Sequence, residues 1–488
     1  MARPLALIGR FDRRALAEAA LVFALACAWV AIVRPGPLSL PYFWDEADVY
    51  VPGARWLAEH GFDITPAHFD DDYSRGHPPL FYLYAALAFR LLGESPSVAH
   101  LAVLPFTALG IASTYLLGAW TFDRSVGLAA AVLLACTPMY LAIGNMLLPE
   151  VPLTALSALA LALFARRKLA LAVLLGVAMV WIKETGIFTA AAIGVGELVQ
   201  QRIERRLDMK RIALATVPLF ALGAFFTMQK LSAGYFVFPH HADLFAERDV
   251  GPLDLLTVVP SLFGWHARWF LSAAAGAGLM LGTRRAAASG DPAAVDRAPV
   301  AAVVAACGGL VLFNAIFFTQ MFWLERYALP AHPGLLVVLA AAVMNGFVRL
   351  APLSRATLRW GLVALVAFVG VLGLRAATPA DEEEHTFAYA DVVRAHQRAC
   401  DALGPADAPV LTSWPMTVEL EDPRLGYRRR RLDAIHERDA DASTTFGAVL
   451  VNAGSWRADA LRAKARAARM SRDERIRVGV APPMEIWR

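Results

Sequence analysis

Long apolar segments separated by short polar connections dominate the first three quarters of the chain. A helix needs about 20 apolar residues to cross a bilayer, and eleven segments approach that length, which predicts about eleven transmembrane helices. They cover residues 15–33, 98–120, 126–143, 151–165, 169–182, 186–199, 212–228, 262–281, 300–318, 328–347 and 358–374. Several of these segments are short or joined by tight turns, so we expect the true ends of the helices to differ from these bounds by several residues.

One further apolar segment, residues 78–92, is too short to span, opens with Pro78-Pro79 and carries Arg90. If this segment lies on the membrane surface, the basic connections gather on one side of the bilayer and most acids on the other, as the positive-inside rule requires. We therefore expect a surface helix within a first outer loop of residues 35–97. The N-terminus would be cytoplasmic, and an odd number of spans would place the C-terminus outside.

The composition changes from about residue 378, where a polar segment begins with Asp381-Glu382-Glu383-Glu384. Its pattern predicts helices and short strands, and so a small extracytoplasmic α/β domain over residues 378–488, after a transmembrane domain of residues 1–377. The expected helices are 391–400 and 456–470, and the expected strands are 410–412, 448–451 and 476–480. The segment holds no catalytic constellation, and its Arg428–Arg431 run is most simply a solvated basic patch.

Composition supports a polytopic membrane protein. Hydrophobic residues make up 58% of the chain and charged residues only 18%, and the mean hydropathy is +0.49. Soluble domains carry about 25% charged residues, so the surplus of apolar side chains must face lipid. The net charge of +4 is too small to imply a nucleic-acid partner, and the four cysteines form no CxxC or Cys/His cluster. The predicted fold class is therefore all-α and polytopic, with a small C-terminal α/β domain.

The first outer loop combines aromatic and acidic residues, in Trp44-Asp45-Glu46 and in the segment 70–77. In one interpretation Asp45 caps an amphipathic helix that runs to Glu59, because an acid suits the first turn of a helix. Capping explains one acid. It does not explain an adjacent Asp-Glu pair pressed against the membrane surface, where a charge is costly. The spacing alone leaves the structural and the functional interpretation evenly balanced.

Other outward-facing ends of the predicted spans repeat this chemistry. Each of them by itself is typical of an interfacial anchor or a helix end. Their collection on one face, with both charge signs and with histidines, favours a shared outward-facing cavity. The segments are Pro149-Glu150-Val151-Pro152, Lys183-Glu184, Arg326-Tyr327 and the loop Tyr235–His241.

Taken in chain order, these motifs resemble those of the GT-C glycosyltransferases, in the branch of the protein O-mannosyltransferases and the lipid A aminoarabinose transferases. The resemblance covers residues 14–350, and its most specific part is the His-Pro-Pro-Leu element after an early Asp-Glu pair. The matching motifs are Asp45-Glu46, Gly76-His77-Pro78-Pro79-Leu80, Pro149-Glu150-Val151-Pro152, Lys183-Glu184 and Arg326-Tyr327-Ala328-Leu329-Pro330.

The resemblance implies transfer of a sugar from a polyprenyl-phosphate carrier to an acceptor on the outer face of the cytoplasmic membrane. The acceptor would be an envelope glycolipid such as lipid A, a glycan or a protein, and a single displacement would invert the anomeric centre. Departure of a phosphate needs charge neutralisation more than a general acid, and an acceptor hydroxyl needs a base. The expected roles are Asp45 and Glu46 as catalytic, with Asp45 the base; Arg75, Lys183 and Arg326 as phosphate-binding; and Tyr50, His77, Glu150, Glu184 and Tyr327 as lining the substrate cavity.

The chain departs from this pattern at two positions. His100 stands where relatives often have arginine, which weakens a phosphate role there, and Glu150 replaces a commoner aspartate. The aromatic-then-histidine loop resembles one that contributes to a metal site in aminoarabinose transferases, so His241 is a candidate ligand for a divalent metal such as zinc. If the acceptor is itself a phosphate, Asp45 would position it or bind metal.

Two other classes of function remain open from the sequence. In a transporter or flippase of a lipid-linked or anionic substrate, the acids and Lys183 would line the transport path. The two halves of the chain show no obvious repeat, however, and the acids concentrate outside the predicted spans. In a non-catalytic scaffold or sensor, the outer domain would bind a ligand and the Asp45 cluster would be dispensable.

Overall fold

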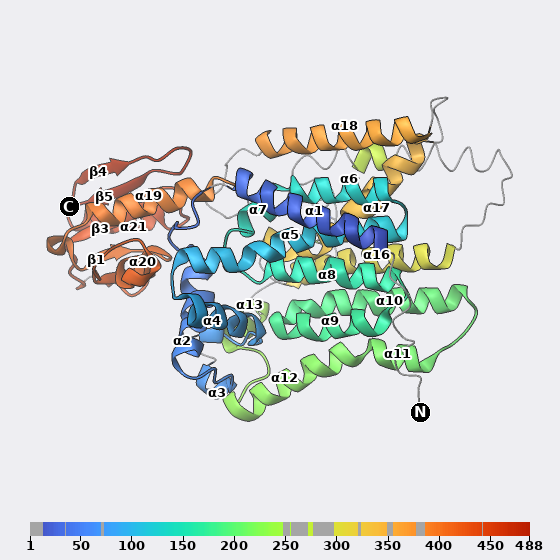
Figure 1. Cartoon of the computed structure of the whole chain (residues 1–488). Helices are drawn as coiled ribbons and strands as arrows, with labels where there is room; N and C mark the ends of the chain where they lie inside the picture. Colours follow the sequence, from blue (N-terminus) through green and yellow to red (C-terminus); the bar gives the residue numbers. More distant parts are fainter. Residues whose placement is uncertain are drawn as a thin grey trace.

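The structure is a computed structural model, and it describes residues 13–34, 36–69, 73–246, 254, 272–276, 297–320, 324–348, 355–376, 386–441 and 443–488. Helices with similar directions form a bundle, and a small α/β domain lies at one end of it (Figure 1). The bundle helices are α1 (Arg13–Val33), α5 (Pro96–Thr121), α6 (Arg124–Ala135), α7 (Pro138–Ile143), α8 (Glu150–Ala165), α9 (Leu169–Ile182), α10 (Ile187–Ile203), α11 (Met209–Ala215), α12 (Val217–Ala233), α16 (Arg297–Gln320), α17 (His332–Val348) and α18 (Arg355–Ala376).

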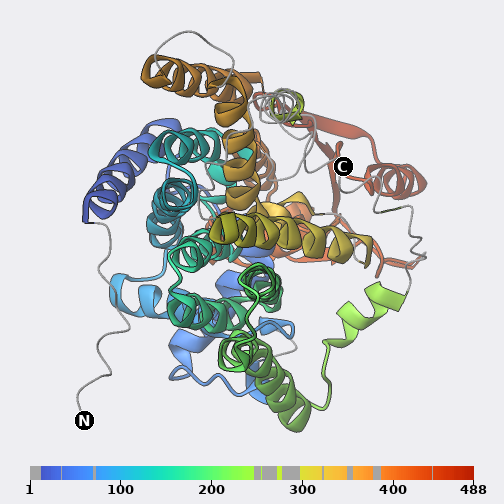
Figure 2. The same cartoon turned by 90° about the vertical axis from the view of Figure 1, so that its right-hand side faces the viewer.

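Five of the described helical segments are long and apolar enough to cross a membrane: Arg13–Val33, Pro96–Thr121, Met209–Ala233, Ala298–Thr319 and Glu325–Met344. Several of these segments expose large apolar side chains within the part of the chain that the structure describes. Ile32 on α1 is 78% exposed and Phe220 on α12 is 71% exposed. In the end-on view α12 and α18 lie at opposite edges of the bundle (Figure 2). Such apolar faces are stable only against lipid, so this is a multi-pass membrane protein.

Several predicted spans are interrupted in the structure. The segment 126–143 divides into α6 and α7 at Pro138, and the segment 212–228 divides into α11 and α12 just before Pro218, because proline cannot donate the backbone hydrogen bond that a continuous helix needs. The segment 328–347 begins as a 3₁₀ helix, η6 (Glu325–Ala331), and continues as α17. The predicted span 262–281 lies largely outside the described residues, and the total of eleven stays a prediction.

The first outer loop folds into short helices beside the end of the bundle. They are η2 (Glu46–Tyr50), α2 (Val51–Glu59), α3 (Pro66–Phe69) and α4 (Leu80–Leu92). A further short helix, α13 (Pro239–Ala246), belongs to the loop that follows α12. Helix α4 coincides with the predicted surface helix and buries Phe81, Tyr82 and Phe89. Its position at the membrane surface stays a prediction.

The C-terminal segment forms an α/β domain, as expected. Its five-stranded sheet has the order β2-β1-β3-β5-β4. Strands β2, β1 and β3 are parallel to one another, and β5 is antiparallel to both of its neighbours, β3 and β4. The sheet buries Val410 and Leu450 on the side of α19, and Leu411 and Val449 on the side of α21. The elements are α19 (Tyr389–Ala402), β1 (Val410–Thr412), α20 (Met416–Glu421), β2 (Ala434–His436), β3 (Ala448–Asn452), α21 (Ala458–Ala467), β4 (Arg472–Ile476) and β5 (Met484–Trp487), with short 3₁₀ turns η7 (Pro405–Asp407) and η8 (Pro423–Leu425).

The strand expected at 476–480 is wrong. The strand lies earlier, at β4, where the first four residues are exposed and mostly charged. An edge strand of this kind has no alternation of buried and exposed residues, so hydrophobic patterning pointed instead to the apolar residues that follow it. The predicted strands at 410–412 and 448–451 and both predicted helices correspond to β1, β3, α19 and α21.

The C-terminal domain packs directly on the first outer loop. The rings of Phe43 and Tyr389 stack with centroids 6.3 Å apart, and the backbone N–H of Tyr42 donates to the carbonyl of Leu425 at 3.1 Å. The two parts share one continuous hydrophobic core. The basic α10–α11 connection lies at the opposite end of the bundle (Figure 1), so the first outer loop and the C-terminal domain belong to the same end.

Candidate functional site

The backbone around Asp45 turns at the edge of the hydrophobic core. Trp44 has a positive φ of 52°, and the chain then enters the π-helical turn η2, which continues as α2 to Glu59. Asp45 occupies the N-cap position of this helix, but its side chain makes no capping hydrogen bond. Its carboxylate instead accepts a hydrogen bond from Nη2 of Arg326. The capping interpretation of the Asp45 side chain is therefore wrong.

Arg326 and Lys183 form a charge cluster with two carboxylates. Arg326 comes from η6 and is 1% exposed. Its Nε lies 3.8 Å from Oε1 of Glu150, the first residue of α8. Nζ of Lys183, at the end of α9, lies 2.7 Å from the same Glu150 oxygen. The structure thus brings together Asp45, Glu150, Lys183 and Arg326 from four separate segments, and we name them the charge cluster. Its two cations balance its two carboxylates, as buried charges require.

Tyr327 covers the cationic side of the charge cluster. The Lys183 ammonium lies 4.1 Å from the centroid of its ring, and the guanidinium carbon of Arg326 lies 5.4 Å from it. A cation over an aromatic face is attracted by the ring quadrupole. Burial by itself lowers the pKa of Lys183, but the negative groups around it, Glu150 first and then Tyr327 and Glu184, together outweigh burial and raise that pKa above its ordinary value. Lys183 therefore stays protonated.

A second ion pair lies beside the charge cluster. Glu184 (η4, Glu184–Gly186) follows Lys183, and its Oε2 lies 3.0 Å from Nδ1 of His77. Burial raises the pKa of Glu184, but the positive charge of His77 and its hydrogen bond dominate and lower the pKa to about 2. The ring of Tyr50 stacks on His77 at 6.4 Å, and burial, followed by the charge of Glu150, raises the pKa of the Tyr50 hydroxyl well above its ordinary value.

Arg75 forms an ion pair with the second carboxylate near the start of this helix, that of Asp48 in η2. Its Nη2 donates to Oδ2 of Asp48 at 2.9 Å, and Nε1 of Trp414 donates to the same oxygen at 3.0 Å. Asp48 follows Asp45 by three residues, so the two carboxylates face one side of the helical turn. Sequence reasoning missed Trp414, because nothing within the C-terminal segment signals contact with a loop 366 residues earlier. The spacing from Asp45 to Asp48 was a usable signal for Asp48.

Glu46 faces away from the charge cluster. It is 1% exposed and accepts hydrogen bonds from the backbone N–H groups of Phe43 at 3.2 Å and Leu147 at 2.8 Å. Nε2 of His100 lies 2.9 Å from its Oε1, and Nδ1 of His100 lies 2.6 Å from the carbonyl oxygen of Leu38. These contacts tie the loop before Asp45 to the segment before Glu150. They favour a positioning role for Glu46, whose expected catalytic role stays a prediction.

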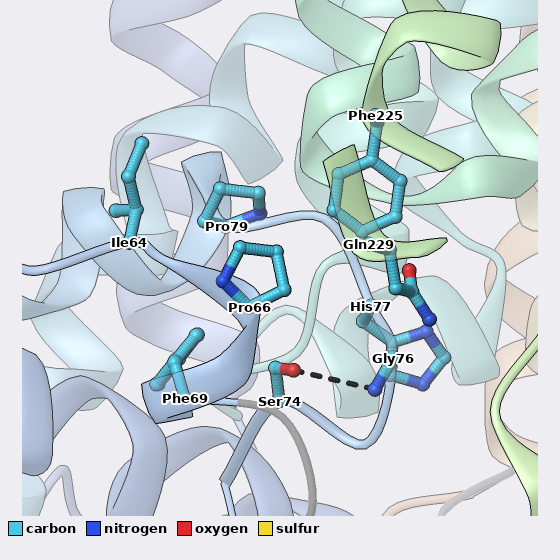
Figure 3. A pocket seen from close by; sticks show the side chains of 9 residues that line it. All are labelled: Ile64, Pro66, Phe69, Ser74, Gly76, His77, Pro79, Phe225 and Gln229. Atoms are coloured by element: carbon cyan, nitrogen blue, oxygen red, sulfur yellow. Dashed lines mark hydrogen bonds between the residues drawn. The ribbon is translucent and has the colours of Figure 1, made fainter. Parts of the chain in front are cut away.

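A small cavity lies between the turn that carries Arg75 and helix α12 (Figure 3). Its volume is about 10 Å³, which is the space for one water molecule. Gln229 of α12 is 1% exposed, and among the described residues neither atom of its side-chain amide has a hydrogen-bond partner. Gly76 has a φ of 77°, and a Cβ there would lie 2.7 Å from Cβ of Phe238. The turn therefore packs closely on α12 and on the loop that follows it.

The expected metal ligand His241 lies beside another histidine, His77. Its ring lies 5.2 Å from the ring of His77. Within the described part of the chain, no group of three or more His, Cys, Asp or Glu residues could hold a metal ion. The described donor set does not fit a resident zinc ion, and metal binding by His241 stays a prediction.

Comparison with known proteins agrees with this architecture. A family model described as dolichyl-phosphate-mannose-protein mannosyltransferase matches residues 76–228. The structure of ArnT from Cupriavidus metallidurans bound to undecaprenyl phosphate is similar, with 16% sequence identity, a TM-score of 0.57 and coverage of 97% of each chain. The apo state of the same protein gives 14% identity, a TM-score of 0.56 and coverage of 97% of this chain and 96% of that chain.

The oligosaccharyltransferase of Archaeoglobus fulgidus, in its complex with Zn and sulfate, gives 14% identity, a TM-score of 0.47 and coverage of 83% of this chain and 61% of that chain. No curated protein sequence matches the chain. The family model and the ArnT fold confirm the expected resemblance to the membrane glycosyltransferases of the GT-C superfamily.

Proposed function

We propose that the protein is a GT-C glycosyltransferase that moves a sugar from a polyprenyl-phosphate donor to an acceptor at the outer face of the cytoplasmic membrane. The observation that carries this proposal is the charge cluster at the end of the bundle that carries the C-terminal domain. Glu150, Lys183 and Arg326 are buried, and Asp45 is partly exposed beside them. A bundle gains little stability from such buried charges, since an apolar replacement of a buried ion pair is often as stable. Buried charges inside a membrane protein favour a functional site.

The charge change of the reaction matches the cations of the site. In the donor, a phosphodiester with one negative charge joins the sugar to the lipid. The acceptor oxygen forms a bond to the anomeric carbon while the bond from that carbon to the phosphate oxygen breaks, so the leaving lipid phosphate carries a second negative charge. Arg326 and Lys183 would stabilise that developing charge, with a guanidinium that can hold two phosphate oxygens at once. Arg75 is a further candidate for phosphate contact.

The pairing of Asp45 with Arg326 supports an exchange of partners on donor binding. A phosphate that engages Arg326 competes with the Asp45 carboxylate for the same N–H groups. The released carboxylate would then accept the proton of the acceptor hydroxyl, as a general base must. A single displacement of this kind inverts the anomeric centre. Glu150, Glu184, His77, Tyr50 and Tyr327 would shape the surrounding cavity.

An apolar cavity near the site has room for part of a prenyl tail. It has a volume of about 310 Å³, and α10, α11, α12 and α16 line it. Its lining begins at Ile187, four residues after Lys183, and continues along α10 to Leu198, a length of about 16 Å at the helical rise. A donor with its phosphate at Lys183 could lay its tail along this cavity. The ArnT structure with undecaprenyl phosphate supports the same class of donor.

The acceptor is an envelope glycolipid, a glycan or a protein hydroxyl, and the C-terminal domain would lie outside the cytoplasm. The test uses the purified full chain in lipid nanodiscs, a labelled polyprenyl-phosphate sugar and an envelope extract. We expect a new labelled product from the wild type and at least about a 100-fold loss of rate in Asp45→Asn, the scale of a lost general base, with donor binding retained.

The conservative variant Asp45→Glu keeps the carboxylate and should keep part of the rate. Full turnover by a folded Asp45→Asn protein would exclude Asp45 as the general base. Movement of the intact donor across a liposome membrane, with no conversion to product, would instead identify a transporter.

A further inference from the structure

Two tryptophans from distant parts of the chain meet beside Asp45. The rings of Trp44, in the first outer loop, and Trp414, between β1 and α20, have centroids 5.2 Å apart at an angle of 76°. Both side chains are half-buried. Trp44 directly precedes Asp45, so the C-terminal domain contributes an aromatic wall to the site. We name the two rings the tryptophan pair.

The contacts that dock the C-terminal domain do not explain the tryptophan pair. Phe43 is 1% exposed and packs against Tyr389, and Arg55 is 5% exposed and bonds to Asp422 of the domain at 2.8 Å. Phe43 and Arg55 are thus buried between the two parts of the chain, as residues at the centre of an interface usually are. Trp44 instead packs at the edge of the core, stays partly exposed and has a positive φ of 52°, a strained conformation for a non-glycine residue that is often found at functional sites.

Polar groups border the tryptophan pair on the side of the charge cluster. The indole N–H of Trp414 donates a hydrogen bond to the Asp48 carboxylate, which also accepts one from Arg75. Asp45 is the residue after Trp44 in the chain. Aromatic faces bordered by a few fixed polar groups are typical of sites for small amphipathic ligands. A pyranose ring has this character, because its axial C–H groups form an apolar face and its hydroxyls form a polar rim.

We propose that the tryptophan pair binds a sugar ring of the acceptor, so that the C-terminal domain selects a saccharide acceptor and presents its hydroxyl to Asp45. This inference rests on the proposed function and narrows its acceptor to a glycan or a glycolipid headgroup. Because the two rings are 76° apart, the apolar face of the sugar lies on the face of one indole ring and the other ring borders its edge. The hydroxyls of the sugar reach Asp45, Asp48 and Arg75.

Binding is tested first, without donor, so that the result does not depend on catalysis. The probes are octyl glycosides with hexose or hexosamine headgroups and, separately, a peptide rich in serine and threonine, each added to the full chain in nanodiscs. Saturation-transfer NMR reports which probe protons contact the protein. With the wild type we expect a saturation-transfer signal at the ring C–H protons of the glycosides and no specific signal from the peptide. With Trp414→Ala we expect the glycoside signal to be lost. Trp456→Ala, which removes a 77% exposed tryptophan of the same domain, should leave the signal unchanged.

The second measurement is the rate of transfer from the labelled polyprenyl-phosphate sugar to the same probes. Trp414→Ala should raise the KM for the saccharide roughly tenfold and leave the donor KM unchanged. Trp414→Phe keeps an aromatic face but loses the N–H bond to Asp48, so its KM for the saccharide should lie between those of the wild type and Trp414→Ala. If Trp414→Ala unfolds, Trp414→Phe is compared with the wild type instead. Sugar transfer with equal saccharide binding by wild type and both variants, or transfer to the peptide alone, would overturn this inference and leave the proposed function standing. Saccharide binding without any transfer would contradict the proposed function instead.

Discussion

The ammonium of Lys183 and the carboxylate of Glu150 lie 2.7 Å apart, with side chains that are 4% and 2% exposed. Glu150 begins α8 and Lys183 follows α9, so this pair joins the ends of two adjacent helices. Removal of Lys183 leaves the buried Glu150 with the longer contact to Arg326 at 3.8 Å, and breaking a buried pair in this way costs more than the pair contributes. The same two residues therefore affect both folding and the proposed phosphate chemistry, and the two effects can be separated.

Replacement of Lys183 alone should destabilise the protein more than replacement of both partners. We expect Lys183→Met to lower the free energy of unfolding by about 3–5 kcal/mol, the usual cost of an isolated buried charge. The double variant Lys183→Met/Glu150→Gln should recover most of that loss. Thermal unfolding in nanodiscs measures both, and both should lack transfer activity. Equal destabilisation in the single and the double variant would show that the pair is not coupled.

The lowered pKa of Glu184 predicts acid resistance of its pair with His77. A carboxylate whose folded pKa lies below its unfolded value contributes stability above the unfolded value of about 4.5, and loses it as the pH falls through the folded value. For Glu184 that folded value is about 2. The difference in melting temperature between wild type and Glu184→Gln should thus stay constant from about pH 5.5 to about pH 4.5 and shrink only below that range.

The control for this measurement is Glu59→Gln, because the Glu59 side chain is 58% exposed and should change the melting temperature little at any pH. A loss of the Glu184 contribution centred near pH 4.5 would contradict the ion pair.

Gly76 and Gly93 form a matched pair for testing the packing of the Arg75 turn. Both have a positive φ, but a Cβ at Gly93 meets no atom within 4 Å, whereas a Cβ at Gly76 lies 2.7 Å from Cβ of Phe238. Gly93→Ala should cost about 1–2 kcal/mol for the strained backbone alone. Gly76→Ala should cost more and should also lower activity, because it displaces Arg75 and His77. Similar melting temperatures for the two variants would contradict the close packing.

Arg55 should hold the C-terminal domain on the first outer loop. Its guanidinium bonds to Glu94 at 2.7 Å and to Asp422 at 2.8 Å. Arg55→Met should increase backbone hydrogen exchange in α20 and in the turn after it, since charge-assisted bonds of this kind contribute about 1.5–3 kcal/mol each. Arg424→Met removes a 57% exposed arginine near the same contact and should change exchange little. Unchanged exchange in Arg55→Met would assign docking to the apolar contacts alone.

Hydrophobic patterning found the elements whose signal is local. The helix after Pro78-Pro79 and the strands β1 and β3 occur where the sequence predicted them. The breaks at Pro138 and before Pro218 were also readable in principle, because proline interrupts a helix wherever it stands. The mostly charged edge strand β4 gave no such signal, since its first four side chains are exposed.

The sequence by itself determined that this chain is a multi-pass membrane protein, and its ordered motifs indicated the resemblance to the GT-C glycosyltransferases. Apolar segment length and motif identity are properties of neighbouring residues, which the chain states directly. Only the tertiary structure decided which charges meet. Asp45 pairs with Arg326 across 281 positions, Glu46 turns toward His100, and Trp414 reaches Asp48 from another domain. These partners depend on how helices pack and on how a separate domain docks, and no local pattern encodes the distance between two side chains that only packing brings together.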